Sequence, residues 1–214
     1  VFRAADFTAR KIPLGLPACG VDLFSRPKTP EAKALSVTQL LRRMKNLLEV
    51  QIGETWKYWK GAQAPAGAAL AWTQRGYAET NWLSGPTGIG YDDGDDATVL
   101  DDMQMTTNPP VPGYTTVYAR RTFPIADRAT IQALDLVIDY DDGFVAYLNG
   151  TEVARSGNVA GSAGTAVPFD ATALPGHEAG TPAIINISAF KDSLVAGNNV
   201  LAIQVLNQAI DSSD

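Results

Sequence analysis

The sequence has little of the chemistry that most enzymes and metalloproteins use. Its 214 residues include one cysteine, Cys19, and one histidine, His177. This count excludes an internal disulfide and the common zinc sites built from several cysteines and histidines. Neither residue lies in a recognisable catalytic motif, and the chain contains no Gly-x-Ser-x-Gly elbow and no phosphate-binding loop signature. We therefore expect a protein that is not an enzyme.

Long hydrophobic runs are also missing, since every apolar stretch is far shorter than the roughly 18 residues that a membrane span requires. Positive charge is scarce outside the N-terminal region. Residues 1–50 contain nine basic and four acidic residues, whereas residues 51–214 contain eight basic and nineteen acidic residues. An acidic body excludes nucleic acid as its expected partner. The chain begins at Val1, and we interpret it as a mature or excised piece of a longer protein.

Two regions of the sequence follow different patterns. In residues 31–50 apolar side chains recur at intervals of three and four, while Arg42, Arg43 and Lys45 lie on another face. This spacing predicts an amphipathic helix over residues 31–50, within an N-terminal extension that covers residues 1–50. Docking of the helix on a neighbouring part of the protein is the preferred interpretation. Binding to an anionic membrane or to a partner is the alternative.

Residues 51–214 predict an all-β domain. Short runs of β-branched and aromatic residues alternate with turns rich in glycine, proline and asparagine, and no helix separates them. The pair Asn149-Gly150 predicts a tight hairpin, and residues 156–181 predict a long loop that contributes little to the core. The pattern favours an antiparallel β-sandwich or jelly roll. The predicted strands are Thr115–Phe123, Leu134–Tyr140, Phe144–Leu148, Thr151–Ala154, Ile184–Ile187 and Asn199–Leu206.

Four segments together resemble a known family. They are Trp56–Gly61, Trp82 with residues 85–98, Asp141–Arg155 and Gly197–Val205. In combination they resemble the galactose-binding-like β-sandwich domains attached to large secreted bacterial proteins, including polysaccharide-degrading enzymes, phosphoesterases and surface proteins. The resemblance covers about residues 51–214. It implies a jelly-roll fold, an extracellular or cell-surface location and the role of an accessory module, often one that binds sugar.

One departure from that family concerns the C-terminus. The segment that corresponds to Asp211–Asp214 normally leads into one more strand, whereas this chain stops there. A sandwich without its last strand would expose an unpaired edge. Three explanations are open: truncation, an N-terminal extension that folds back, and a strand donated by another molecule.

A sugar site requires an aromatic ring to stack on a pyranose and polar groups to bind its hydroxyls. Residues around Trp56 are expected to form an additional strand, the first of the domain. Trp56 and Tyr58 share one of its faces and are expected in the core, so Trp59 is expected to point outward. The predicted ligand-binding residues are Trp59, Trp72, Arg75 and Tyr77. An alternative is that Trp72, Arg75 and Tyr77 pack beneath residues 156–181.

An acidic segment predicts a possible cation site. Asp92, Asp93, Asp95 and Asp96 surround Gly94 and offer several carboxylate oxygens to a structural Ca²⁺. Sandwiches of the resembled family commonly hold such an ion. A metal-free acidic turn is the alternative, since aspartate also stabilises turns without a metal. Neighbouring aspartates on a strand point to opposite faces, which disfavours a glycosidase pair.

These observations favour a non-catalytic extracellular module that binds a glycan or anchors a larger secreted protein. The competing hypothesis is a structural subunit of a cell-surface or filamentous assembly, joined through its N-terminal arm or a donated strand. In that hypothesis the basic residues 1–50 dock on the acidic body of a neighbouring copy. The partners that we expect are therefore a polysaccharide, further domains of a parent protein, or a second copy of the chain.

Overall fold

The computed structural model describes residues 2–11, 48–91, 94 and 96–212, with side chains from Val50 onward. Most of the predicted helix over residues 31–50 lies outside these residues. Its last three residues are instead strand β2 (Leu48–Val50), which pairs antiparallel with β1 (Phe2–Lys11). The prediction of a helix is wrong there, because backbone pairing with a neighbouring strand overrides the local helical spacing. In the described parts of the chain no helix is long and apolar enough to cross a bilayer.

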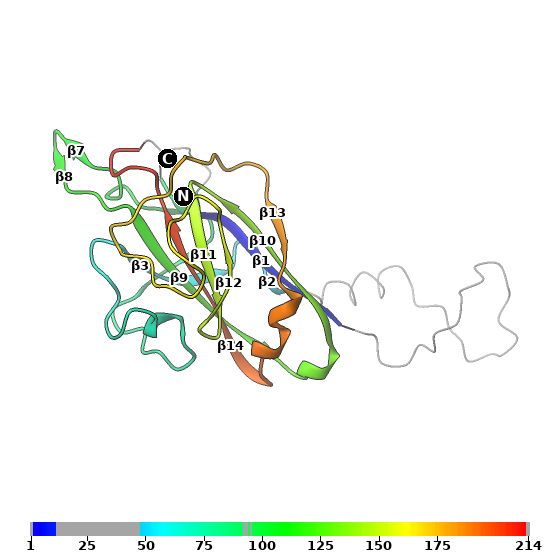
Figure 1. The fold of residues 1–214 in the computed structure, drawn as a ribbon. Coiled ribbons are helices and arrows are strands. Elements are labelled where there is room, and N and C mark those ends of the chain that lie inside the picture. The colour runs from blue at the N-terminus through cyan, green and yellow to red at the C-terminus, as the bar shows by residue number, and fades with distance from the viewer. Residues whose placement is uncertain (1, 12–47, 92–93, 95, 213–214) are drawn as a thin grey trace, which may run out of the picture.

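The first sheet contains six strands, in the order β13-β10-β1-β5-β6, with β2 also paired to β1. Strand β1 pairs antiparallel with β10 from Phe2 opposite Tyr140 to Lys11 opposite Ile131, and Figure 1 shows the two side by side. Residues 2–11 therefore belong to the sandwich itself. The other members are β5 (Ile89–Gly90), β6 (Thr98–Val99), β10 (Ile131–Tyr140) and β13 (Ala183–Asn186).

The second sheet has the order β12-β11-β14-β9-β3-β4, with every neighbouring pair antiparallel. Together the two sheets confirm the predicted all-β sandwich. All six predicted strands are present to within three residues at each end, the largest difference being β10, which begins at Ile131 and not at Leu134. The members of this sheet are β3 (Thr55–Lys60), β4 (Leu83–Pro86), β9 (Thr116–Ile125), β11 (Gly143–Leu148), β12 (Thr151–Arg155) and β14 (Gly197–Leu206).

Smaller elements join the strands. Strands β7 (Thr106–Thr107) and β8 (Pro110–Val111) form a separate hairpin, and the helical turns η1 (Ala71–Thr73), η2 (Arg128–Thr130) and η3 (Ser188–Ser193) are all short 3₁₀ helices. The hairpin between β11 and β12 turns at Asn149 and Gly150, which have φ values of 51° and 91°. Positive φ at both turn residues is what a type I′ turn requires, so the prediction of this hairpin is confirmed.

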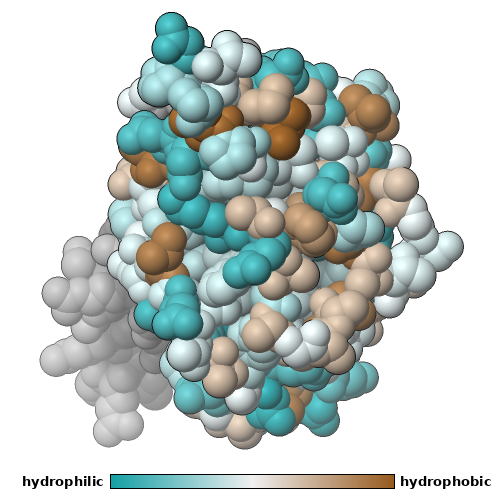
Figure 2. All heavy atoms as spheres, turned by 90° about the vertical axis from the view of Figure 1, so that its left-hand side faces the viewer, coloured by the Kyte–Doolittle hydropathy of each residue, from teal (hydrophilic) through white to brown (hydrophobic). Residues whose placement is uncertain are grey.

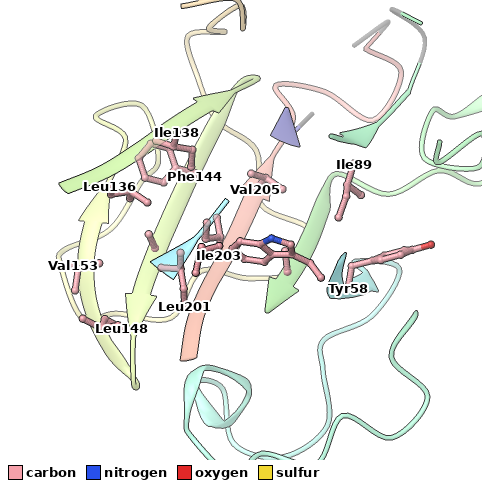
Figure 3. Packing of buried hydrophobic residues seen from close by; sticks show 14 of the residues in the cluster. Tyr58, Ile89, Leu136, Ile138, Phe144, Leu148, Val153, Leu201, Ile203 and Val205 are labelled. Atoms are coloured by element: carbon pink, nitrogen blue, oxygen red, sulfur yellow. The ribbon is translucent and has the colours of Figure 1, made fainter. Parts of the chain in front are cut away.

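The space between the two sheets holds the main hydrophobic core (Figure 3). Alternate residues of β11 and β14 point into it, among them Phe144, Leu148, Leu201 and Ile203, each no more than 1% exposed. On β3 the same alternation buries Trp56 and Tyr58, as the sequence predicts. This core leaves Trp59 and Lys57 on the outer face of the second sheet.

The outer face of the second sheet is covered as well. A second cluster of buried residues includes Trp72, Tyr118, Tyr147 and Ala202, and residues 61–82 and 156–173 close over it. Val159, Val167 and Ala173 from the long loop are no more than 9% exposed. The loop over residues 156–181 therefore contributes to a core, which corrects the expectation that it would contribute little. It lacks a regular strand, as predicted, apart from a single bridge between Val159 and Ala173.

Candidate functional site

A groove of about 410 Å³ lies beside β3, at the end of that strand and against β4. The groove combines an indole, a phenol ring and an aliphatic side chain with an ammonium group and two amides. Leu83, in β4, is 44% exposed there. The lining residues are Tyr58, Trp59, Lys60, Ala62, Gln63, Asn81 and Leu83.

The ring of Trp59 is held in place on two sides. Its indole Nε1 donates a hydrogen bond of 2.9 Å to the carbonyl oxygen of Gln63, four residues along the chain. Its ring centroid lies 6.2 Å from that of Trp82, which is buried. A half-buried indole that is fixed in this way presents a preformed apolar surface to the groove.

Behind Trp59, the aromatic rings form a connected cluster. Tyr77 packs edge-on against Trp82 at 5.9 Å. The guanidinium of Arg120 lies 5.2 Å from the ring centroid of Tyr77 and 5.9 Å from that of Trp82. Both distances are within the range of a cation–π interaction. The position of Trp59 therefore depends on Trp82 and, through it, on Arg120.

Arg120 is the central polar residue of this region, with an exposed fraction of 2%. It lies on β9, pairs with Glu79 at 2.9 Å, and donates hydrogen bonds to the carbonyl oxygens of Trp72 and Gln74. The N–H groups of a buried guanidinium need hydrogen-bond acceptors. Here the acceptors belong to the loop over residues 70–79, so these bonds hold that loop against the sheet. The sequence patterns do not single out Arg120. The one signal that the sequence offers is a pair of adjacent arginines, Arg120 and Arg121, in the middle of a predicted strand.

Trp72 is not an exposed platform, which corrects the expectation from the sequence. Its exposed fraction is 2%, and its ring packs edge-on against Tyr118 at 4.9 Å and Tyr147 at 5.6 Å. The helical turn η1 lays Trp72 on the outer face of β9 and β11, in the same buried cluster as Val159. This arrangement matches the alternative in which Trp72 packs beneath the long loop.

Arg75 and Tyr77 do not line the groove at Trp59. Arg75 is exposed and donates a hydrogen bond of 3.4 Å to the carbonyl oxygen of Asn198. Tyr77 is half-buried, and its hydroxyl donates to the carbonyl oxygen of Ala66 at 3.1 Å. The structure thus separates Trp59 from the three residues with which the sequence grouped it. Gln63, Asn81 and Leu83 line the groove together with Trp59 instead.

Burial changes the acidity of the tyrosines beneath the loops. Burial raises the pKa of Tyr118 to about 12, with the nearby Tyr147 adding to the effect. Burial also raises the pKa of Tyr147 to about 12, and the charge of Glu152 contributes. The hydroxyl of Tyr118 accepts a hydrogen bond of 3.3 Å from Gln204 Nε2. These rings are neutral parts of the second core.

Of the predicted cation ligands, Asp92, Asp93 and Asp95 lie outside the described residues. Asp96 is half-buried. Within the part of the chain that the structure describes, no three His, Cys, Asp or Glu side chains are placed together to hold a metal. The calcium site therefore stays a prediction.

A further aspartate pair, Asp141 and Asp142, organises a loop. Asp142 is fully buried and accepts backbone hydrogen bonds from His177 at 2.8 Å and Gln208 at 2.6 Å. Asp141 accepts one from Ala179 at 3.1 Å. The carboxylates therefore lead into β11 and also hold residues 177–179 against the sandwich.

No protein-family model matches the chain, and no curated protein matches it. Solved structures of three β-glucuronidases are similar to it: that of an uncultured Clostridium species (18% identity, TM-score 0.43), that of Ruminococcus gnavus (15%, 0.42) and Bacteroides uniformis β-glucuronidase 2 (16%, 0.45). The matches cover 73%, 72% and 74% of this chain. They cover 21%, 20% and 14% of those chains, so this chain spans about a fifth of their length or less.

Proposed function

We propose that the chain is a carbohydrate-binding accessory module of a larger extracellular or cell-surface protein, with the groove at Trp59 as its ligand site. The observation that carries the proposal is a fixed, half-buried indole bordering a groove of about 410 Å³. A pocket of this volume is in the usual range for small-ligand sites. The apolar face of a pyranose stacks on an aromatic ring, while neighbouring polar groups bind its hydroxyls.

The polar lining suits hydroxyl recognition. Gln63 and Asn81 each offer an amide donor and acceptor, and Lys60 offers an ammonium that already pairs with Asp102 at 2.8 Å. The described lining residues include no carboxylate, imidazole or thiol. A groove of this composition supports binding without catalysis.

A glycan array read with the whole chain tests this function. Wild-type protein should bind a defined set of glycans, and Trp59→Ala should weaken that binding about tenfold, the equivalent of about 1.4 kcal/mol. Trp59→Phe should keep most of it, because a stacking ring remains. Melting curves of both variants would show that the fold is intact. Equal binding by wild type and Trp59→Ala, or no binding to any glycan, would contradict the proposal.

We also propose that a structural Ca²⁺ binds the acidic segment around Gly94, through Asp92, Asp93, Asp95 and Asp96. The chemistry of the donors supports it, since calcium prefers several carboxylate oxygens. A ligand that binds only the native state stabilises it by mass action. A chelator should therefore lower the melting temperature, and added Ca²⁺ should restore it. An unchanged melting curve would refute the site.

A second candidate function is a structural subunit that assembles through its first strand. Strand β1 fills an interior position of the first sheet, between β10 and β5. A strand in such a position can be supplied by the same chain or by a neighbouring copy. Light scattering over a concentration series would then show growing assemblies, which deletion of residues 1–30 should abolish. A monomer at every concentration would exclude this function.

A further inference from the structure

A second hollow, of about 270 Å³, lies on the same outer face of β3, two residues before Trp59. Its lining is polar and charged, in contrast to the groove at Trp59. The lining residues are Thr55, Trp56, Lys57, Glu79, Ser84, Arg120, Arg121 and Thr122. We propose that this hollow is a subsite for an anionic substituent, such as the carboxylate or sulfate of an acidic saccharide; this deepens the proposed function and rests on it.

The strand register explains why these groups converge. Lys57 on β3 is directly opposite Ser84 on β4 and directly opposite Arg120 on β9. Side chains of residues paired across neighbouring strands share one face of the sheet. Thr55 and Thr122 follow at the next positions of the same parity on their strands. The side chains of the three paired residues and the hydroxyls of the two threonines therefore lie on one face of the sheet, around the hollow.

The balance of charge in the hollow is positive. Arg120 is neutralised by Glu79 at 2.9 Å, and Arg121 by Glu54 at 3.2 Å. The ammonium of Lys57 makes no hydrogen bond or ion pair with the described residues, so it is the one unneutralised charge of this lining. The remainder of residues 51–214 is strongly acidic. A half-buried cation of this kind in an acidic protein is a local site for an anion, and the hydroxyls around it supply further donors.

The two hollows suit one ligand. Residues two apart on a strand lie about 7 Å apart, which is comparable to the size of one sugar ring with its substituents. Figure 2 views the side of the molecule on which Figure 1 places β3, and hydrophobic residues there form small areas separated by hydrophilic ones. This surface favours a small polar ligand over an extended protein interface. A ring stacked on Trp59 could therefore place its acidic group beside Lys57.

The test uses the whole chain and two sugars that differ only at one carbon. Galacturonate carries a carboxylate where galactose carries a hydroxymethyl group. In a nuclear magnetic resonance titration, galacturonate should shift the backbone amide signals of Lys57, Ser84 and Thr122, and galactose should not. Lys57→Gln should weaken galacturonate binding about tenfold, as expected for one charge-assisted hydrogen bond. Higher salt should weaken it further.

The matched control is Lys191→Gln, which removes the same charge from the exposed turn η3 against the other sheet; it should bind both sugars as wild type does. Two results would overturn the subsite. In the first, galacturonate leaves the amide signals of Ser84 and Thr122 unmoved. In the second, Lys57→Gln weakens the binding of both sugars equally. Shifts at Gln63 and Asn81 with both sugars would show that the proposed function survives that failure. Shifts at Ser84 without any at Gln63 would show that the anionic subsite stands while the proposed groove at Trp59 fails.

Discussion

The two faces of the second sheet use the same strands in different ways. The inner face packs against the first sheet mainly through apolar side chains, such as Phe144 and Ile203. The outer face is covered by two loops and mixes aromatic rings with a guanidinium, Arg120, and an amide, Gln204. The inner face is stabilised mainly by area removed from water. The outer face also depends on satisfied polar pairs. At its margin Lys57 and Trp59 stay half-buried, and this is where we propose that the ligand binds.

The largest loss of stability should come from truncating a buried side chain on the inner face. Phe144 is 1% exposed, and Phe144→Ala should lower the free energy of unfolding by about 3–5 kcal/mol. Chemical denaturation measures it. Ile184→Ala, at a side chain that is 75% exposed on β13, is the control and should change stability by no more than about 0.5 kcal/mol. Equal effects of the two substitutions would contradict the placement of the core.

Arg120→Met should break the outer face selectively. It leaves Glu79 and two carbonyl oxygens without their donor, at a cost of about 2–4 kcal/mol. Protease sensitivity should rise within residues 70–82, while the strands of the inner core stay protected. Arg128→Met removes an exposed guanidinium that donates to the carbonyl oxygens of Asp192 and Leu194, away from the loop over residues 70–82. It should cost less and leave the protection of residues 70–82 unchanged. Unchanged protection of residues 70–82 would show that Arg120 does not hold the loop.

Alkaline pH should also act on the outer face. The pKa values of Tyr118 and Tyr147 are raised to about 12 in the folded chain, so each keeps its proton where the unfolded chain loses it. Their stabilising effect is complete below pH 10, the ordinary tyrosine value, and is lost as the pH rises towards 12. Each contributes a slope of up to about 1.4 kcal/mol per pH unit in that window. Tyr118→Phe should reduce the slope, which melting curves between pH 9 and 12 would reveal; an unchanged slope would argue against burial of this hydroxyl.

The smallest effect concerns the contact between the covering loop and the β11–β12 hairpin. A Cβ atom on Gly150 would lie 2.1 Å from the Nε2 atom of Gln74, and the φ of Gly150 is +91°. Gly150→Ala should therefore destabilise the fold by about 1–2 kcal/mol. The Nε2 atom of Gln74 ends a flexible, exposed side chain that can move aside, so adding Gln74→Ala should recover little of that loss and leave the part due to the backbone. Full recovery in the double variant would contradict a backbone origin of the loss.

The inner face could be predicted from the sequence, whereas the outer face could not. Alternation on β3 correctly buries Trp56 and Tyr58, and Asn149-Gly150 correctly predicts a hairpin. The same rules place Trp72 in a loop and say nothing of what that loop covers, because burial by a loop depends on tertiary contacts without periodicity. Arg120 went unnoticed for the same reason. Parity alone places Trp59 on the outer face, whereas grouping Lys57 with Ser84 and Arg120 requires the strand register.

The most direct test of this account compares the solvent exposure of the four tryptophans. The chain would be labelled with 5-fluorotryptophan, its fluorine signals assigned by single Trp→Phe variants, and each signal compared in H₂O and D₂O. The account predicts the largest solvent isotope shift for Trp59, with almost none for Trp56 and Trp72. A shift at Trp72 equal to or larger than that at Trp59 would contradict it, because the outer face would then be open.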